Sequence, residues 1–335
     1  MLAQLEIPPL ARPLPPVFGP DKPWLAPLAG YSDLPFRLLC RSYGAAVCET
    51  EMISAKGLFH QARRTLDYLR TIPEDAPLVT QIFGSDPESV GAAARKLREA
   101  NYLYLDFNAG CSVRKVFKQG AGAALLADKK NFLAIAKALI EAARAEDGKP
   151  RGMAGFKLRL GVDSREGVMP DLGLALEDLG ADWLALHPRS ARDHFAGEAD
   201  WRRIEELASR VSIPVLASGD LFAARDGLEC LRQTGAAGVM YARGALHNPR
   251  VFAEHKALAL GEAIERGKED LIEVISRHAS LARAYGPERG ALAKTRSLIP
   301  RYAREFPGVG QLRRALCEAR EWSDVERVAR EFFAA

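Results

Sequence analysis

The stretch WLAPLAGYSDLPFRLLCRSYGAAVCETE, residues 24–51, contains the unit that decides the fold of this chain. It opens and closes with short apolar runs, WLAPLA at 24–29 and AVCETE at 46–51, and a longer segment lies between them. β-Rich runs of this length that alternate with segments of helical period are typical of parallel βαβ units. The stretch therefore predicts two parallel strands joined by a helix.

The same alternation continues through six further runs. They are LVTQIF at 78–83, YLYLDF at 102–107, GFKLRL at 155–160, DWLALH at 182–187, PVLAS at 214–218 and AGVMYA at 237–242. Eight parallel strands with intervening helices predict an α/β fold of the closed (β/α)8 type, a TIM barrel. We expect this barrel to span residues 23–250, after a proline-rich leader at 1–22.

No strand pattern returns after the eighth run. From about residue 250 the chain reads as helices separated by glycine and proline, so we expect an all-helical C-terminal domain over residues 251–335. Within it, residues 289–314 carry seven basic side chains against the single acid Glu305. Such an excess suits a surface that binds a polyanion, although a solvated helix face would also explain it.

The composition is that of an ordinary globular protein and argues against several classes. The chain has 335 residues, of which 48% are hydrophobic and 27% charged, with a net charge of +4. Its N-terminal leader is interrupted by prolines and lacks the apolar core of a signal peptide or membrane span, so we expect a cytoplasmic protein without a membrane partner. The five cysteines have no metal-ligand spacing, and neither a zinc site nor a disulfide framework is expected.

Chemistry in a TIM barrel gathers at the C-terminal ends of the strands. Each predicted strand supplies small or polar residues there. In chain order they are Pro27 to Ala29, Glu51, Gln81, Asn108 to Cys111, Lys157, His187, Ser218 to Asp220, and Ala242 to Gly244. Any one of them could be structural, but their convergence from all eight strands predicts a functional site at that end of the barrel.

The loops after the seventh and eighth strands are the usual phosphate site of such barrels. Small residues at Ser218, Gly219 and Ala242 let the backbone approach a phosphate, and Arg243 can pair with its oxygens. Neither a GxxxxGK[ST] motif nor a strand-linked GxGxxG motif occurs, which argues against ATP and a Rossmann-bound dinucleotide.

Two polar residues, Gln81 and Lys157, lie inside runs that are otherwise apolar. Burying an amide or an ammonium group without partners costs several kcal/mol, so a polar ligand is expected beside them. A cation near N1 and O2 of an isoalloxazine ring, with an amide at its pyrimidine edge, is what a flavin requires. Lys157 suits the first task and Gln81 the second.

Cys111 is the one cysteine in a polar, glycine-rich loop, at 111–122. A thiol with a pKa near ~8.5 could act there as a nucleophile or as a general acid, and no base partner is apparent in the sequence. The cations Arg114, Lys115 and Lys118 suit a mobile lid over an anionic substrate. His187 is the only histidine at a strand end, and we expect the other five to be surface or packing residues.

Seven stretches, taken in order, resemble the tRNA-dihydrouridine synthase family over nearly the whole chain. They are LAPLAGYSDLPFRLLCRSYGA at 25–45, PLVTQIFGSDPE at 77–88, DFNAGCSVRKVFKQGAGAALL at 106–126, GFKLRLGVD at 155–163, LHPRSARDHFAGEADW at 186–201, IPVLASGDL at 213–221 and GVMYARGALHNPRVF at 238–252. The resemblance implies an FMN-binding barrel, a helical tRNA-binding domain and NADPH as the reductant.

The resemblance also implies roles for individual residues. FMN would be held by Pro27, Leu28, Ala29, Gln81, Lys157, His187, Ser218, Gly219, Asp220, Ala242 and Arg243. Reduced FMN would pass a hydride to C6 of an extruded uracil in tRNA, while Cys111 protonates C5. For the tRNA substrate we expect contacts from Asn108, Arg189, Arg114 and Lys115, and from Arg296, Arg301 and Arg304 in the basic stretch. No metal is expected, and we expect a monomer.

The sequence departs from the family pattern at several of these places. Ser112 stands where the family usually has proline, Ser218 where it has asparagine, and Phe195 where it has tyrosine, while the usual HGRT reads HPRS at 187–190. Two other functions therefore stay open at this point. One is an FMN-dependent small-pyrimidine dehydrogenase of the dihydroorotate dehydrogenase type, which would not need the basic stretch. The other is a tRNA-binding flavoprotein without catalytic activity.

Overall fold

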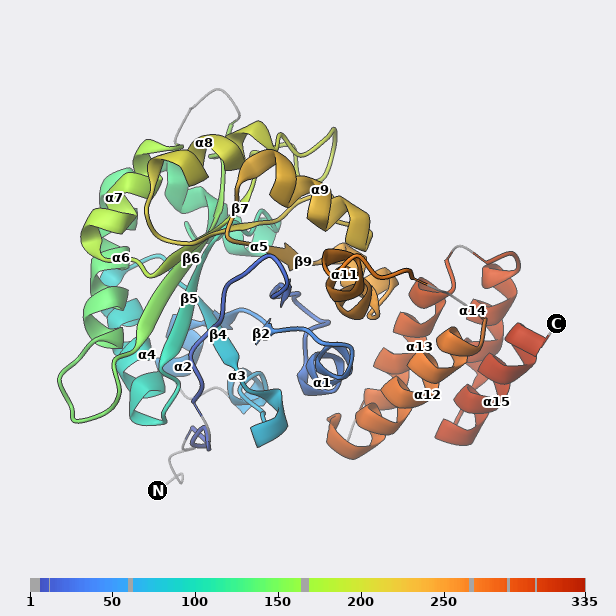
Figure 1. Ribbon diagram of the computed structural model, residues 1–335. Helices are drawn as coiled ribbons and strands as arrows, with labels where there is room; N and C mark the ends of the chain where they lie inside the picture. The colour runs from blue at the N-terminus through green and yellow to red at the C-terminus, as the bar shows by residue number, and fades with distance from the viewer. Residues whose placement is uncertain are drawn as a thin grey trace, which may run out of the picture.

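The computed structural model describes residues 7–11, 13–59, 63–163, 169–264, 268–287, 290–304 and 306–334. These residues form a strand barrel surrounded by helices, with a layer of C-terminal helices on one flank (Figure 1). None of the described helices is both long enough and apolar enough to cross a membrane.

Eight strand positions close into a barrel. They are β1 Trp24–Leu25, β2 Val47–Glu49, β4 Leu78–Phe83, β5 Tyr104–Ala109, β6 Met153–Arg159, β7 Trp183–His187, β8 Val215–Ala217 and β9 Gly238–Tyr241. Neighbouring strands are parallel, and the ring closes because β1 pairs with both β2 and β9 while β2 also pairs with β4. A two-residue strand, β3 Ile53–Ser54, extends the second position and also pairs with β4. The TIM-barrel prediction is confirmed.

Helices cover the outside of this barrel. The longer ones are α1 Leu34–Ser42, α4 Pro87–Glu99, α6 Lys129–Ala143, α7 Asp171–Leu179, α8 Arg202–Arg210 and α9 Ala224–Thr234. Local signals set their ends: the Asp86 side chain accepts a hydrogen bond from the Ser89 N–H at 2.9 Å and caps α4. Gly180 and Gly235 end α7 and α9 in the left-handed conformation that glycine adopts without a steric penalty.

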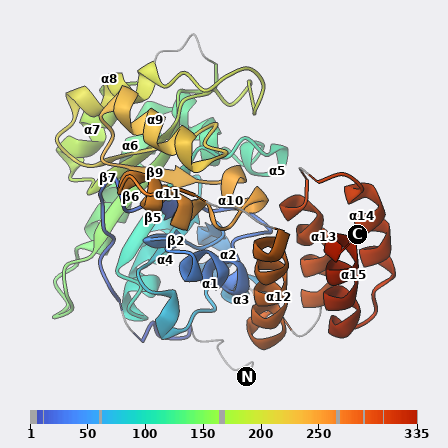
Figure 2. The same cartoon turned by 45° about the vertical axis from the view of Figure 1, so that its right-hand side comes forward.

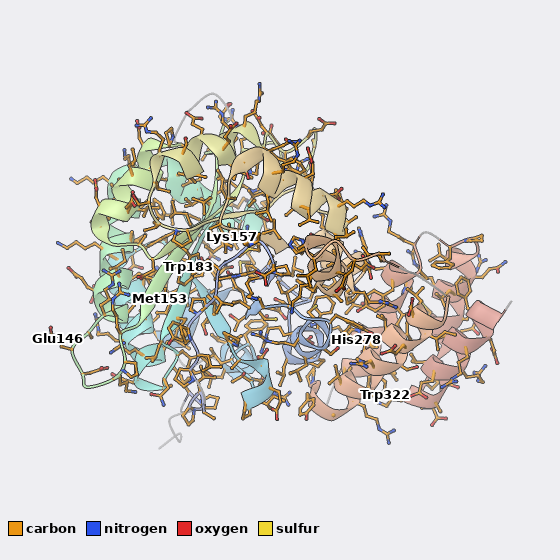
Figure 3. The ribbon with its side chains drawn as sticks, in the orientation of Figure 1. Glu146, Met153, Lys157, Trp183, His278 and Trp322 are labelled. Atoms are coloured by element: carbon orange, nitrogen blue, oxygen red, sulfur yellow. The ribbon has the colours of Figure 1, made fainter. Side chains whose placement is uncertain are left out.

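Large side chains fill the barrel interior. A buried cluster there is formed by Trp24, Ala26, Val47, Val79, Leu103, Tyr104, Trp183, Ala185, Leu216 and Met240. Gly155 makes room for the indole of Trp183, because a Cβ at this position would lie 1.9 Å from Trp183 Cε2. Figure 3 places Trp183 within the barrel and Lys157 farther along β6, away from Met153. This cluster fills the barrel towards the N-terminal ends of the strands, and Lys157 lies beyond it towards the C-terminal ends.

Two helices connect the barrel to the C-terminal layer. They are α10 Arg243–His247 and α11 Val251–Ala259, and α11 packs against α9. His255 on α11 contacts the Tyr241 hydroxyl at 2.9 Å and the Pro20 carbonyl at 2.6 Å. The domain boundary at residue 250 stays a prediction, since the helix that follows it still packs on the barrel. Of the predicted leader, residues 1–6 and 12 lie outside the described part of the chain.

The C-terminal layer consists of helices, as predicted. They are α12 Lys268–Tyr285, α13 Ala291–Tyr302, α14 Val309–Glu318 and α15 Trp322–Ala334. Helix α12 packs against α13 and α15 within the layer and against α1 of the barrel (Figure 2). Its buried His278, which lies on the side of α12 near α1 in Figure 3, contacts the Tyr302 hydroxyl at 2.9 Å.

Polar contacts hold α13 against the loop that follows β1. The Lys294 ammonium lies 2.7 Å from Asp33 and 3.7 Å from Glu51, and Arg301 donates to the Tyr31 hydroxyl at 2.8 Å. Glu51 also accepts a hydrogen bond from the Gly30 N–H. The C-terminal layer is thereby anchored at the same end of the barrel as the strand-end residues.

Candidate functional site

A cavity of about 480 Å³ opens at the C-terminal end of the barrel strands. Its volume is within the usual range for a small-molecule site. Each residue predicted to hold the cofactor lines it: Pro27, Leu28, Ala29, Gln81, Lys157, His187, Ser218, Gly219, Asp220, Ala242 and Arg243. Asn108, Cys111 and Arg114 line the same cavity. The barrel thus brings together residues that are more than 200 positions apart in the chain.

A hydrogen-bonded row of side chains forms one wall. Gln81 Nε2 donates to Asp106 Oδ2 at 2.7 Å, and Gln81 Oε1 accepts from Asn108 Nδ2 at 2.8 Å. Asn108 Oδ1 accepts from the backbone N–H groups of Gly110 at 3.1 Å and Cys111 at 2.8 Å. The row therefore connects the barrel interior to the loop that carries the cysteine.

Sequence reasoning missed two acids behind this wall, Glu49 and Asp106. Both are fully buried, and both lie near the Gln81 amide. A signal for them was present, because each is an acid within a predicted buried strand, AVCETE for Glu49 and YLYLDF for Asp106. They do not line the cavity.

Lys157 reaches the cavity from β6. Burial lowers the pKa of its ammonium group, while the neighbouring Glu49 and Asp106 carboxyl groups act in the opposite direction. Within the described residues its ammonium group makes no hydrogen bond to the protein. Its donors are therefore available to a polar group in the cavity.

His187 is neutral at the edge of the cavity. Burial and the nearby cations Arg159, Lys157 and Arg189 lower its pKa to about 2. Its Nε2 lies 3.2 Å from Arg189 Nη1, which can only donate, so Nε2 must be the acceptor. The proton of the imidazole is then on Nδ1, which can donate a hydrogen bond.

The loops after β8 and β9 have the features of an anion site. Gly219 and Asp220 adopt positive φ angles of 106° and 55°. In the part of the chain that is described, the amide N–H groups of residues 219–221 have no protein partner. A Cβ at position 219 would lie 2.8 Å from His187 Cδ2, so glycine lets the loop after β8 approach the end of β7. The Arg243 guanidinium stands beside them, 4.6 Å from the ring of Phe195 and 4.8 Å from the ring of Phe222.

Arg189 does not line this cavity. Its guanidinium is 3% exposed and binds Asp220 with both nitrogens, at 2.6 and 2.9 Å. Although burial raises the pKa of Asp220, hydrogen bonds from Arg189 and the Ala199 N–H hold that pKa below its usual value. These contacts favour a role for Arg189 in holding the loop after β8. Its contact with substrate stays a prediction.

Cys111 lies half-buried on the cavity wall. Burial raises the pKa of its thiol, against weaker opposing effects of the Val113 N–H and the Arg159 charge. The loop is folded tightly at its far end: Gly122 has a φ of 63°, and a Cβ there would lie 2.5 Å from the Cys111 carbonyl oxygen. The cysteine is therefore a protonated thiol at neutral pH in a fixed loop, as a general acid requires.

One histidine has a position that the sequence did not reveal. His194 is exposed, as predicted, but it also lines the cavity, and its Nδ1 lies 3.1 Å from the Ser112 hydroxyl. Ser112 is the residue that replaces the usual proline, so this contact links the cysteine loop to the loop after β7. His60, another of the predicted surface histidines, lies outside the described residues.

The basic stretch forms a second concave surface beside the cavity. Arg296, Arg301, Arg304 and Arg313 line a groove of about 570 Å³ together with His247. Arg296 also donates to carbonyl oxygens at the end of α14, and Arg304 lies 3.0 Å from His247 Nδ1. The His247 ring stacks on Phe222, which lines the cavity, with centroids 6.2 Å apart. The groove therefore begins where the cavity ends.

The other residues predicted to contact tRNA lie around the opening of the cavity. Lys115 is exposed on α5 Arg114–Phe117, and it does not line the cavity. Figure 2 shows α5 and α10 on the side of the barrel that faces α13. Arg289 and Glu305 of the basic stretch lie outside the described residues.

Comparisons with known proteins agree on one family. Residues 24–334 match the family model described as dihydrouridine synthase (Dus). The probable tRNA-dihydrouridine synthase of Mycobacterium tuberculosis (strain CDC 1551 / Oshkosh) is 33% identical over 315 residues, which are 90% of this chain and 79% of that protein. The probable tRNA-dihydrouridine synthase of Aquifex aeolicus (strain VF5) is 32% identical over 298 residues, 88% of this chain and 90% of that protein.

A solved structure shares the fold. The crystal structure of TcOYE with pHBA superposes with a TM-score of 0.51 at 9% identity, over 79% of this chain and 95% of that one. At this identity the likeness concerns the barrel architecture alone.

Proposed function

This chain belongs to the dihydrouridine synthase family, and we propose that it reduces uridines in tRNA to 5,6-dihydrouridine, with FMN as its cofactor and NADPH as the reductant. One observation carries the proposal beyond family membership. A single cavity is lined by a protonated thiol at Cys111, a half-buried ammonium group at Lys157 and an anion site at Gly219 and Arg243. The cavity therefore offers groups that could bind a phosphate-bearing redox cofactor and a thiol that could act as general acid on the substrate.

The residues of the cavity fit FMN. The loop amides of 219–221 and the Arg243 guanidinium suit the phosphate, because they offer donors and positive charge, and Arg243 is held beside the loop by a 3.0 Å contact with Asp220 Oδ1. The free donors of Lys157 and His187 suit the polar edge of the ring, and Leu158, Met52 and Met240 supply apolar contact. When bound, FMN supplies the hydride for uracil C6 after it has been reduced by NADPH.

Cys111 would supply the proton that completes the reduction. Addition of one hydride at C6 and one proton at C5 saturates the uracil double bond, and the thiolate that remains recovers a proton from solvent. The raised pKa of the Cys111 thiol keeps it protonated until the substrate arrives. Asn108 accepts a hydrogen bond from the Cys111 N–H, and Arg159 donates to the Gly110 carbonyl at 2.9 Å. These two bonds fix the backbone that carries the thiol, so the proton donor is already positioned when the substrate binds.

The groove beside the cavity would hold the tRNA backbone. A uridine must leave its stack to enter the cavity, which costs a few kcal/mol, and contacts elsewhere on the tRNA have to compensate. Arg296, Arg301 and Arg304 line the groove, and each phosphate that they neutralise releases counterions and adds affinity. Arg114 and Lys115 on α5 would bind phosphates on the other side of the opening.

The experiment that tests this function separates it from both rivals. Purified protein is incubated with NADPH and unmodified tRNA, and dihydrouridine is measured by mass spectrometry of the digested tRNA. Formation of dihydrouridine in tRNA, with no turnover of dihydroorotate or free uracil, is the expected result. Turnover of the small pyrimidines alone would favour the dehydrogenase. Tight tRNA binding with bound flavin and no product would favour the non-catalytic flavoprotein.

A variant pair tests the assignment of the proton donor. Cys111→Ala should still bind FMN and allow its bleaching by NADPH, but dihydrouridine formation should fall at least ~10²-fold, as for loss of a positioned general acid. Cys230→Ala, which removes a buried cysteine on α9 outside the cavity, is the matched control and should keep activity. Equal loss of both half-reactions in Cys111→Ala would show that the residue instead maintains the site.

A further inference from the structure

The barrel interior holds two carboxyl groups that the proposed reaction does not use. Glu49 on β2 and Asp106 on β5 are both 0% exposed. Gln81 lies between them, because β4 pairs with β2 on one side and with β5 on the other. Its Nε2 is 2.7 Å from Asp106 Oδ2 and 3.4 Å from Glu49 Oε2. The two carboxyl groups therefore approach the same nitrogen from opposite sides.

Their other oxygens have no partner. Glu49 Oε1 and Asp106 Oδ1 are buried and make no hydrogen bond within the described residues. An ionised carboxylate in such a place is costly, and two of them beside one amide would also repel each other. The geometry thus disfavours a state in which both are charged.

One cation faces the two acids. Burial and then the charge of Asp106 raise the pKa of Glu49, whereas Lys157 on β6 lowers it. Burial raises the pKa of Asp106 as well, against the Gln81 hydrogen bond and the Lys157 charge. Two other residues act near Lys157: Arg159, two positions farther along β6, lowers the Lys157 pKa by its charge, and His187 is neutral. The only compensation for the Lys157 charge within this cluster comes from the acids.

We propose that Glu49 and Asp106 share one proton near neutral pH and act as positioning residues, with a single negative charge that keeps Lys157 protonated at the wall of the cavity. The inference rests on the proposed function in one respect, namely that Lys157 faces FMN. It follows that loss of the shared proton at higher pH places a second negative charge behind the cofactor. Reduction of FMN then becomes less favourable, because the reduced flavin carries negative charge near Lys157.

The first test uses protein without cofactor. Infrared spectroscopy of the apoprotein at neutral pH should show the carbonyl stretch of a buried carboxylic acid. Glu49→Gln should weaken this band, because Asp106 then opposes Lys157 without a second carboxyl group beside the Gln81 amide, although burial still raises its pKa. Asp106→Asn should weaken it as well, because the Asp106 charge no longer raises the pKa of Glu49, and it serves if the first variant fails to fold. The control Glu254→Gln, which removes a buried glutamate on α11 bound to Asn248, should keep the band. Absence of the band in the wild type, or its survival at full strength in both acid variants, would overturn the proposal.

The second test reads the consequence at the flavin. The midpoint potential of the FMN-loaded protein is measured against pH by spectroelectrochemistry. Because the reduced flavin favours the protonated pair, the wild type should take up as much as one additional proton per two electrons over a window above neutral pH. Glu49→Gln should lack that window and keep a similar potential below it. Identical slopes in wild type and Glu49→Gln would contradict the proposal. A protein that never binds FMN would instead refute the proposed function, and the infrared result would still decide whether the acids share a proton.

Discussion

The side-chain oxygen of Asn108 accepts a hydrogen bond from the backbone N–H of Cys111 at 2.8 Å. Asn108 belongs to β5 and is 8% exposed, and its amide nitrogen donates to Gln81 on the neighbouring strand. The position of the cysteine is therefore set by a barrel strand, although Cys111 itself lies in a loop. A site supported in this way keeps its geometry better than one carried by a free loop.

Asn108→Ala should impair proton donation without removing the thiol. The Cys111 N–H loses its acceptor, and a misplacement of about 1 Å can lower the rate of a positioned group by about 10²-fold. We expect dihydrouridine formation to fall by roughly 10- to 100-fold, with NADPH oxidation changed much less. Single-turnover measurements of the two half-reactions check this. Asn131→Ala, which removes the hydrogen bond from the Asn131 amide on α6 to the Ser85 carbonyl oxygen, is the control, and similar losses in both variants would contradict the role of Asn108.

The pH dependence of uridine reduction should follow the thiol of Cys111. Because burial raises the pKa of this group, the protonated form that donates to C5 persists above the range of an ordinary thiol. We expect the tRNA-dependent reoxidation of the flavin to decline only at a pH above ~8.5 and to decline as pH rises, since the acid form is lost. Stopped-flow flavin absorbance across a pH series measures it. A decline centred below neutral pH would mean that Cys111 is not the titrating acid.

The groove arginines should govern the salt dependence of tRNA binding. Replacing Arg296, Arg301 and Arg304 with glutamine removes three charges from one surface. We expect weaker binding and a salt slope reduced by up to about three, because fewer counterions are released. Filter-binding or fluorescence titrations at several salt concentrations give the slope.

Three arginines on α8 and α9 provide a matched control for this triple variant. Arg202, Arg203 and Arg232 on α8 and α9 are three arginines with side chains at least 40% exposed outside the groove. Their replacement by glutamine should leave the slope nearly unchanged. If the groove variant and this control had equal slopes, the tRNA contacts would have to be sought around Arg114 and Lys115.

The buried ion pair between Arg37 and Asp75 should matter for stability rather than for chemistry. Their side chains are 1% and 0% exposed, and Arg37 Nη2 lies 2.7 Å from Asp75 Oδ2. Arg37 also donates to the carbonyl oxygens of Ser32 and Arg70, so it ties α1 to the segment before β4. Asp75→Asn leaves the guanidinium without its counter-ion, and we expect a loss of about 3–5 kcal/mol in the free energy of unfolding.

Chemical denaturation followed by circular dichroism measures that loss. The surface pair between Arg232 and Glu229 provides the comparison, because its members are exposed and solvent screens their attraction. Glu229→Gln should change the unfolding midpoint little. An equally small effect of Asp75→Asn would show that the buried pair can be replaced by a neutral hydrogen bond.

How much the sequence predicted depended on the range of the interactions. Helix ends such as those at Asp86 and Gly180 depend only on neighbours within a few residues, so their signals are local features of the sequence. The strand-end residues could be predicted for another reason. In a parallel barrel the carboxyl ends of all strands lie on the same side, so a residue's position at the end of its strand already places it near the other strand ends. The polarity of the strands was enough to predict that Gln81, Lys157 and Arg243 lie together, and all three line one cavity.

Partners across the barrel were not readable in this way. The sequence suggested Arg189 as a substrate contact, yet its guanidinium binds Asp220, 31 residues away, on the loop after the next strand. The acids Glu49 and Asp106 stand out within their runs, but their meeting at the Gln81 amide depends on how the strands either side of β4 pair, which the sequence does not show. The contact between Arg301 and Tyr31 joins residues 270 positions apart.

The sequence by itself determined the barrel, the end of it that carries chemistry and most of the groups gathered there. Those features follow from hydrophobic period and strand polarity, which are local properties of the chain. The tertiary structure alone decided which charges face each other, which nitrogen of His187 keeps its proton and how Cys111 is held. The physical reason is that such pairings depend on strand register and barrel closure, and both are properties of the whole packed chain rather than of any segment.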